Sequence, residues 1–196
     1  MKTYHFNAAE RDLSDFMYAY SPVPKEHKPF VLWDDCLANY PVGAPDSPEN
    51  SAYVSIISKE AYASGTKFST TCSFGEFGAP LIVFTDDLGE NADGTGLYGL
   101  HFEVVAYEGG CNFWHIEPWP ERVERPIKTQ KIAFEEFEIK PDETITITVE
   151  VKDKTITAWV NGHVISCENA DVPEKFHVGI TACEGPNRFY DFTVED

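Results

Sequence analysis

Residues Thr144 to Gly162 read TITITVEVKDKTITAWVNG, and this stretch decides the fold. From Ile145 to Val151 every second residue is apolar and the residues between are polar, so an extended strand here has one dry face and one wet face. The Asn161-Gly162 dipeptide accepts the positive φ angles of a type I′ turn at little cost, and His163 to Ile165 then forms a return strand. The pattern predicts consecutive antiparallel hairpins.

The register of the first hairpin follows from its turn. If Asp153-Lys154 forms a two-residue turn, Lys152 pairs with Thr155. The apolar positions then coincide across the two strands, as Val151 with Ile156, Val149 with Ala158, and Ile147 with Val160.

The rest of the chain repeats this organisation. Short apolar or alternating runs separated by turn-rich segments predict further strands, and no internal repeat or linker divides the chain. We expect strands at 3–6, 30–33, 52–57, 66–74, 80–85, 97–107, 112–117 and 128–134, with a brief helical turn from Ala8 to Phe16. So many strands must close into a barrel or pack as two sheets. The prediction is one all-β domain over residues 1–196, a two-sheet antiparallel β-sandwich of the jelly-roll type.

Composition narrows the function classes. The formal net charge of −18 opposes binding to a phosphate backbone, so no nucleic-acid partner is expected. The sequence contains no run of about 18 apolar residues, so no membrane partner is expected either. The start, MKTYHFNAAERD, lacks the apolar core of a secretory signal, and the five cysteines form no CxxC pair. These features predict a cytoplasmic protein with free thiols, or a secreted one if the sequence is trimmed.

A family resemblance rests on the C-terminal segments. The strand pair, the VNG turn at 160–162, the VGI strand at 178–180 and the closing FYDFTV at 189–194 resemble the concanavalin A-like lectin/glucanase superfamily. The laminin G-like and 3-keto-disaccharide hydrolase-like domains are the most similar members. The resemblance implies a jelly roll with a ligand groove on its concave sheet, and its members include sugar-binding modules, hydrolases and structural domains.

The candidate site is a second hairpin, GLYGLHFEVVAYEGGCNFWHIEPW, over residues 96–119. A turn at Gly109-Gly110 predicts that Ala106 lies opposite Phe113 and Val105 opposite Trp114. The face opposite the core then collects an imidazole, a carboxylate, an amide and two aromatic rings, from His101, Glu103, Tyr107, Asn112 and Trp114. Sugar recognition uses these groups, because CH groups stack on aromatic rings while hydroxyls need donors and acceptors. The alternative is that loops cover this face, with Trp114 and Glu103 as ordinary buried residues.

Two further tryptophans are weaker candidates for ligand binding. Trp159 lies on the non-core face of its hairpin and offers a second stacking surface, or packs under a loop. Trp119, in EPWPER, borders a groove or pins its loop to the body.

Catalysis needs suitably placed acid/base groups. Retaining glucanases of the superfamily carry a Glu-x-Asp-x-x-Glu motif, and here Glu103 and Glu108 occupy the outer positions while Val105 replaces the Asp. This substitution argues against conventional two-carboxylate hydrolysis. A different lytic chemistry would use Glu103 with His101 or His115, because histidine transfers protons near neutral pH.

No cofactor is required by these patterns, and calcium is the one candidate. The segment TDDLGENADG is rich in oxygen ligands, and its candidates are Asp86, Asp87 and Asp93, with Glu90 and Asn91 beside them. A solvated acidic loop is the alternative. His101 and His115 lie at no zinc-type spacing with a third ligand.

Three functions therefore remain open. The leading one is a lectin-like carbohydrate-binding protein. The second is a small glycoside hydrolase or lyase using Glu103 and a histidine. The third is a non-catalytic assembly subunit, for which a homo-oligomer is expected.

Overall fold

The computed structural model describes residues 1–19, 28–88 and 100–196, and its C-terminal hairpins have the predicted register. Strands β12 (Ile145–Lys152) and β13 (Thr155–Val160) pair Lys152 with Thr155 and Ile147 with Val160. The φ angles of Asp153 and Lys154 are 49° and 67°, so the turn has the left-handed residues of type I′. Asn161 and Gly162 repeat this at 50° and 86° before β14 (His163–Glu168). Both predicted turns are confirmed.

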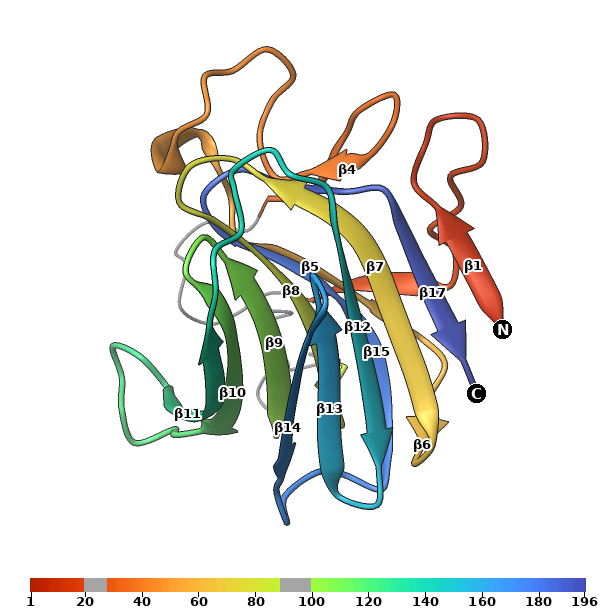
Figure 1. Cartoon of the computed structure of the whole chain (residues 1–196), viewed down its shortest axis with the longest axis vertical. Coiled ribbons are helices and arrows are strands. Elements are labelled where there is room, and N and C mark those ends of the chain that lie inside the picture. The colour runs from red at the N-terminus through yellow and green to blue at the C-terminus, as the bar shows by residue number, and fades with distance from the viewer. Residues whose placement is uncertain (20–27, 89–99) are drawn as a thin grey trace.

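The strands form two antiparallel sheets stacked face to face (Figure 1). Sheet A has the order β14-β13-β12-β7-β16-β4-β3, with β17 beside β7 and β1 on β17. Its remaining strands are β1 (Lys2–His5), β3 (Val31–Leu32), β4 (Leu37–Ala38), β7 (Thr66–Phe74), β16 (Asn187–Phe189) and β17 (Asp191–Glu195). The pairing of β1 with β17 places the two chain ends side by side.

Sheet B has the order β11-β10-β9-β8-β15-β5-β2, with β6 on β15. Its strands are β2 (Phe16–Ala19), β5 (Val54–Ser58), β6 (Tyr62–Ala63), β8 (Gly78–Thr85), β9 (His101–Tyr107), β10 (Gly110–Pro118), β11 (Ile127–Glu136) and β15 (Lys175–Glu184). A short 3₁₀ turn, η1 (Pro48–Asn50), precedes β5. The predicted all-β two-sheet sandwich is confirmed.

The main core lies between the sheets. Sheet A contributes Ile147 and Val149, and sheet B contributes Phe84, Phe102 and Val104, all at most 1% exposed. The rings of Phe84 and Phe102 stack at a centroid distance of 4.9 Å. The apolar residues of each alternating strand therefore face the other sheet, as a period of two requires.

Sheet B is apolar on its outer face as well. Every residue of β8 is buried, and its outward side chains Leu81 and Val83 are 2% and 0% exposed. Two small clusters form there, one around Ile57 and Val83 and the other around Leu81 and Val105. The unbroken apolar sequence of β8 explains this, because a strand covered on both faces does not alternate.

The predicted helical turn from Ala8 to Phe16 is present only as a single turn at its start. The side chain of Asn7 accepts from the backbone N–H groups of Ala9 and Glu10, as an N-cap does, and its carbonyl accepts from the N–H of Arg11 at 2.9 Å. The turn does not continue as a helix, because Asp12 accepts from the N–H of Ser14 in a second, separate turn. Phe16 instead begins β2, which was not predicted, and its ring is buried in the core. The two-residue strands β4 and β6 were also not predicted.

The cysteines form no disulfide. All five are free; Cys36, Cys72 and Cys111 are buried, and Cys167 and Cys183 are partly buried. Burial raises the pKa of Cys36 and Cys111 to about 12. These thiols therefore stay protonated at neutral pH.

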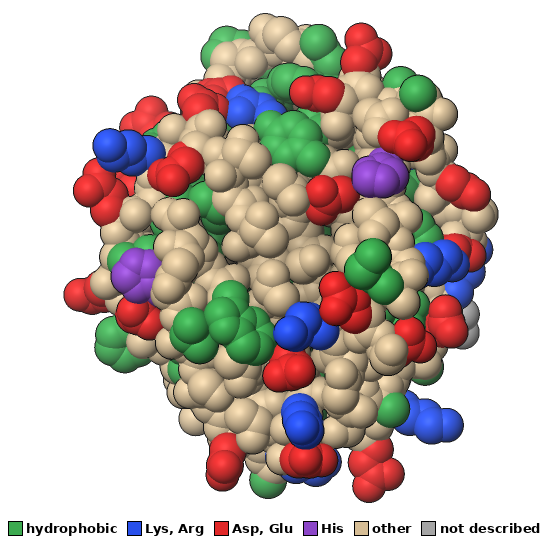
Figure 2. Space-filling view, turned by 45° about the vertical axis from the view of Figure 1, so that its right-hand side comes forward, with side chains coloured by type: hydrophobic (Ala, Val, Ile, Leu, Met, Phe, Trp, Pro, Cys, Tyr) green, Lys and Arg blue, Asp and Glu red, His purple; other side chains and the backbone are tan. Residues whose placement is uncertain are grey.

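The surface is acidic, and Figure 2 shows acidic side chains spread over one face with basic ones scattered among them. Among the described residues, no helix is long and apolar enough to cross a membrane.

Candidate functional site

The candidate site lies on the outer face of the β9–β10 hairpin, whose register differs from the prediction by two residues. The turn is Glu108-Gly109, and Gly110 pairs with Tyr107. Trp114 therefore lies opposite Glu103 and Asn112 opposite Val105.

Gly110 explains this shift. Its φ is +130°, and a Cβ placed there would lie 2.1 Å from the carbonyl oxygen of Glu135 on β11. Only glycine fits this position, so Gly110 belongs to the sheet rather than to the turn. A shift of two residues preserves the face of every side chain. The outward placement predicted for His101, Glu103, Tyr107, Asn112 and Trp114 therefore holds, since their partners across the hairpin alternate in the same way.

One end of this face is buried and carries a polar group of three side chains. His101 and Glu103 are 3% and 8% exposed. The Nε2 atom of His101 lies 3.5 Å from Oε1 of Glu103, and the Tyr53 hydroxyl donates to the same oxygen at 3.2 Å. The Nδ1 atom of His101 is buried without a hydrogen-bond partner in the described part of the chain. An unsatisfied buried polar atom costs about 1–3 kcal/mol, so this end of the face carries an uncompensated polar atom.

The other end of the face is more open. Tyr107, Asn112 and Trp114 are partly exposed, and the rings of Tyr107 and Trp114 pack on the Leu81–Val105 cluster. The Oδ1 atom of Asn112 is itself buried and has no hydrogen-bond partner among the described residues. This end combines aromatic surface with an unused acceptor.

Sequence analysis missed two residues of this open end, Lys131 and Phe134. Phe134 on β11 lies opposite Asn112 and is 62% exposed, and the Lys131 ammonium lies 5.3 Å from the ring centre of Trp114 and 5.5 Å from that of Phe134. A bulge between Phe113 and Trp114 in the pairing with β11 sets this alignment. The register between β10 and β11 was needed to find them, because the loop 119–126 that joins the two strands is too long to fix their pairing as a two-residue hairpin turn does. We call Tyr107, Asn112, Trp114, Lys131 and Phe134 the hairpin patch.

His115 does not join this face. It pairs with Phe102, points between the sheets and stacks on the Phe102 ring at a centroid distance of 4.6 Å. Its side chain is 3% exposed, and burial lowers the pKa of the imidazole. His115 is therefore separated from Glu103 by the sheet itself.

The remaining tryptophans lie elsewhere. Trp159 pairs with Thr148 on the outer face of sheet A, on the opposite side of the sandwich, with the Lys67 ammonium 5.1 Å from its ring centre. Trp119 is 43% exposed in the loop before β11, with Arg122 over its ring at 5.6 Å. Neither contributes to the hairpin patch.

The calcium candidates are described only in part. Asp86 and Asp87 directly follow β8, where the Asp87 N–H donates to the Thr85 hydroxyl at 3.1 Å, and Asp93 lies outside the described residues together with Glu90 and Asn91. In residues 1–19, 28–88 and 100–196, neither aspartate belongs to a group of three potential metal ligands. Calcium binding here stays a prediction.

The glucanase motif does not assemble a second carboxylate beside Glu103. Val105 is 8% exposed within the outer apolar cluster, and Glu108 is exposed in the hairpin turn. The run therefore places one carboxylate on the strand and the other in solvent.

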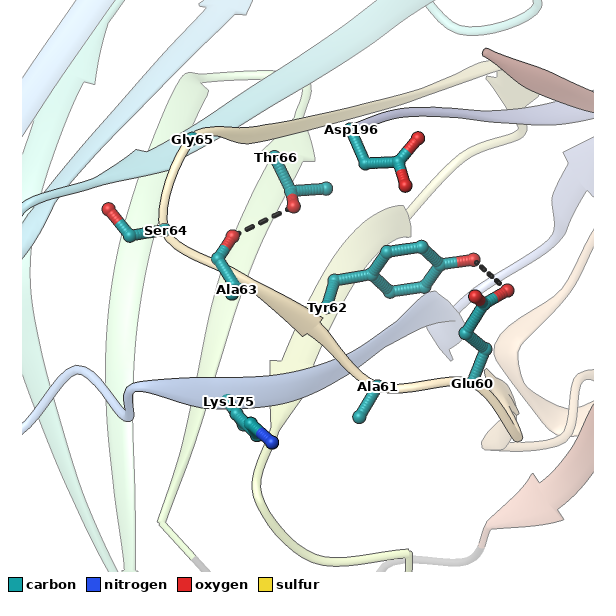
Figure 3. A pocket seen from close by; sticks show the side chains of 9 residues that line it. All are labelled: Glu60, Ala61, Tyr62, Ala63, Ser64, Gly65, Thr66, Lys175 and Asp196. Atoms are coloured by element: carbon teal, nitrogen blue, oxygen red, sulfur yellow. Dashed lines mark hydrogen bonds between the residues drawn. The ribbon is translucent and has the colours of Figure 1, made fainter.

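A separate hollow of about 420 Å³ lies beside β6 (Figure 3). Two of its polar side chains are already paired, because the Tyr62 hydroxyl donates to Glu60 at 3.3 Å and the Thr66 hydroxyl donates to the Ala63 carbonyl at 2.8 Å, while Lys175 and Asp196 also line it. The hairpin patch, with its unused acceptor, is the stronger candidate for ligand binding.

Comparison with known proteins supports the fold class. No family model and no curated protein matches this sequence. Among solved structures, β-agarase A from Zobellia galactanivorans matches with a TM-score of 0.65 and 11% identity, over 98% of this chain and 88% of that chain. A glycoside hydrolase family 16 endo-glucanase from Bacteroides ovatus matches with a TM-score of 0.63 and 8% identity, over 99% of each chain. The carbohydrate-binding module CBM66 from Bacillus subtilis matches with a TM-score of 0.56 and 14% identity, over 74% of this chain and 82% of that chain.

The chain therefore has the concanavalin A-like jelly-roll fold, and the predicted resemblance is confirmed. Proteins of this fold with similar structures include both sugar-binding modules and sugar-cleaving enzymes. At these identities the match defines the fold, and the function must be argued from the site.

Proposed function

We propose that this protein binds a neutral carbohydrate at the hairpin patch. The observation that carries the proposal is the unpartnered Oδ1 of Asn112 beside the partly exposed rings of Tyr107 and Trp114. Sugar CH groups stack on the aromatic surface, and a hydroxyl donates to the amide oxygen, which is buried without a ligand and turns outward to accept. The exposed Phe134 ring extends this surface by one strand.

The charge of the protein favours a neutral sugar. A formal net charge of −18 repels sulfated and uronic acid polymers at long range. Lys131 is the one cation of the patch, and its ammonium lies over the Trp114 ring. Lysine is a long, flexible side chain, so a ligand can displace it from the ring at small cost.

The test compares two tryptophans in similar surroundings. Trp114 and Trp159 are both partly buried and both lie under a lysine, at 5.3 and 5.1 Å, but on opposite sheets. After a thermal-shift screen of neutral oligosaccharides, titration calorimetry should show at least a tenfold loss of affinity in Trp114→Ala and no change in Trp159→Ala. Equal effects of the two substitutions would overturn the assignment to the hairpin patch.

A second candidate function, glycoside cleavage, is favoured by the His101–Glu103 pair. Nε2 of His101 lies 3.5 Å from Oε1 of Glu103, and a carboxylate beside an imidazole is the pair of groups that acid/base catalysis uses. Turnover that is lost in Glu103→Gln, with sugar affinity retained, would support an enzyme. Binding without turnover in the unmodified protein would support a module.

An assembly subunit would show neither activity and would form a stable oligomer. Light scattering on the same samples distinguishes this third outcome.

The five free cysteines fit a reducing compartment, so we propose a cytoplasmic location.

A further inference from the structure

Three potential metal ligands meet at one end of the sandwich. His115 and Glu117 lie two residues apart on β10 and so point to the same side of sheet B. Asp171 reaches them from the connection between β14 and β15, which crosses the lower end of the molecule in Figure 1. One ligand atom from each residue lies within 4.8 Å of the other two.

The His115 side chain is fixed in place but makes no hydrogen bond within the described residues. Its ring is fixed by the stack on Phe102, and its side chain is 3% exposed. Nδ1 faces Oδ2 of Asp171 at 4.0 Å, beyond hydrogen-bond distance, and Nε2 is buried. In the described part of the chain neither ring nitrogen has a hydrogen bond. A buried imidazole with both nitrogens unused is unusual in a native protein.

The backbone around Asp171 is also fixed. The Asp171 N–H donates to the Asn169 side chain at 2.8 Å, and the next residue, Val172, is 2% exposed in the main core. The Asp171 carboxylate itself is 56% exposed and free to rotate. Rotation of the Asp171 carboxylate on its fixed backbone can therefore bring its oxygen closer to the other two ligand atoms when an ion binds.

We propose that His115, Glu117 and Asp171 bind one divalent cation of the zinc class. One imidazole and two carboxylates suit zinc with water as the fourth ligand, whereas calcium takes 6–8 oxygens. Bonds of about 2.0–2.1 Å to a tetrahedral ion require ligand atoms closer together than 4.8 Å, and the two carboxylates supply that movement. Lys128 is the competing cation, since its ammonium lies 3.1 Å from Glu117 and is 59% exposed. Zinc binding releases this lysine to solvent.

The bound ion would tie the β14–β15 connection to β10 and hold the two sheets together at this end. The site faces the interior between the sheets, whereas the hairpin patch lies on the outer face of sheet B. Zinc binding is therefore independent of the proposed sugar site.

The experiment measures zinc binding by the full chain after removal of metal with EDTA and dialysis. Titration calorimetry with ZnCl₂ should give one ion per chain. The midpoint of thermal unfolding should rise by about 5–10 °C at a zinc concentration near 100 times the dissociation constant. CaCl₂ at the same concentration should give no shift.

Two substitutions locate the ion and a third serves as the control. Asp171→Asn changes a half-exposed loop residue without threatening the fold, and His115→Gln removes the nitrogen ligand; each should weaken zinc binding at least tenfold. His163→Gln removes another histidine that is paired with a carboxylate, since its Nδ1 lies 2.7 Å from Oε1 of Glu135. This variant should bind zinc as tightly as the unmodified protein. Absence of a zinc-dependent shift, or equal binding by Asp171→Asn and the unmodified protein, would overturn the proposal.

Discussion

The substitution Gly110→Ala tests why the candidate hairpin has its register. Alanine at φ +130° would be strained by about 1–3 kcal/mol. Its Cβ would also lie 2.1 Å from the carbonyl oxygen of Glu135, and moving that backbone costs about 1–3 kcal/mol more. The expected loss of unfolding free energy is the sum, about 2–6 kcal/mol.

Gly65 is the matched control. Its φ is +98°, but a Cβ there meets nothing within 4 Å. Gly65→Ala therefore carries the strain without the collision, and its expected loss is about 1–3 kcal/mol. The effect of the added methyl group on the unfolded chain is common to both variants and cancels in the comparison.

The measurement is urea unfolding of both variants followed by tryptophan fluorescence, with thermal unfolding as a second probe. For a chain of this size 1 kcal/mol corresponds to about 2–4 °C, so the midpoint of Gly110→Ala should lie about 2–12 °C below that of Gly65→Ala. Equal losses would refute the argument that contact with β11 requires glycine and sets the register of the hairpin.

Four further substitutions test the core, the surface and the turns by urea unfolding. Phe102→Ala should lower the free energy of unfolding by about 3–5 kcal/mol, because its ring is 1% exposed and packs between Phe84 and His115. Phe134 is 62% exposed, so Phe134→Ala should change this free energy by less than about 0.5 kcal/mol. Asn39→Ala should lower the free energy of unfolding by about 2–4 kcal/mol, because the buried amide donates to two backbone carbonyls and accepts from one N–H. A loss below about 0.5 kcal/mol, as at a surface position, would contradict this role. Phe77→Gly should stabilise by up to about 1 kcal/mol, because Phe77 is exposed at φ 63°, and a clear destabilisation would show that its ring makes a contact worth more than the strain.

Local sequence predicts register where the turn alone decides it. The hairpins at Asp153-Lys154 and Asn161-Gly162 are both as predicted, because the two turn residues of each adopt positive φ and the alternation agrees on both sides. At Gly109-Gly110 the same rule fails. Gly110 is required by the backbone of β11, a strand some 20 residues further on, and no local pattern contains that information.

The same limit applies to the site residues. Alternation places Trp114 and Glu103 on one face, and the structure agrees. His115, predicted as an alternative acid/base partner of Glu103, lies on the other face, stacked on Phe102. Alternation cannot show that Lys131 lies over Trp114, since that contact depends on the bulge. Nor can it show that Asp171 approaches His115, because a connection between two strands brings it there.

The two proposed sugar-related functions would use one surface and differ in access to one carboxylate. Trp114 and Glu103 face each other across the hairpin, so a sugar stacked on the ring would lie directly beside Glu103. Glu103 is 8% exposed and already accepts from the Tyr53 hydroxyl, so a catalytic role requires this end of the face to open. Binding at the hairpin patch requires displacement of Lys131 from the ring and exposure of the buried Oδ1 atom of Asn112. Because the rings of Tyr107 and Trp114 are already partly exposed and Glu103 is not, we propose binding ahead of cleavage.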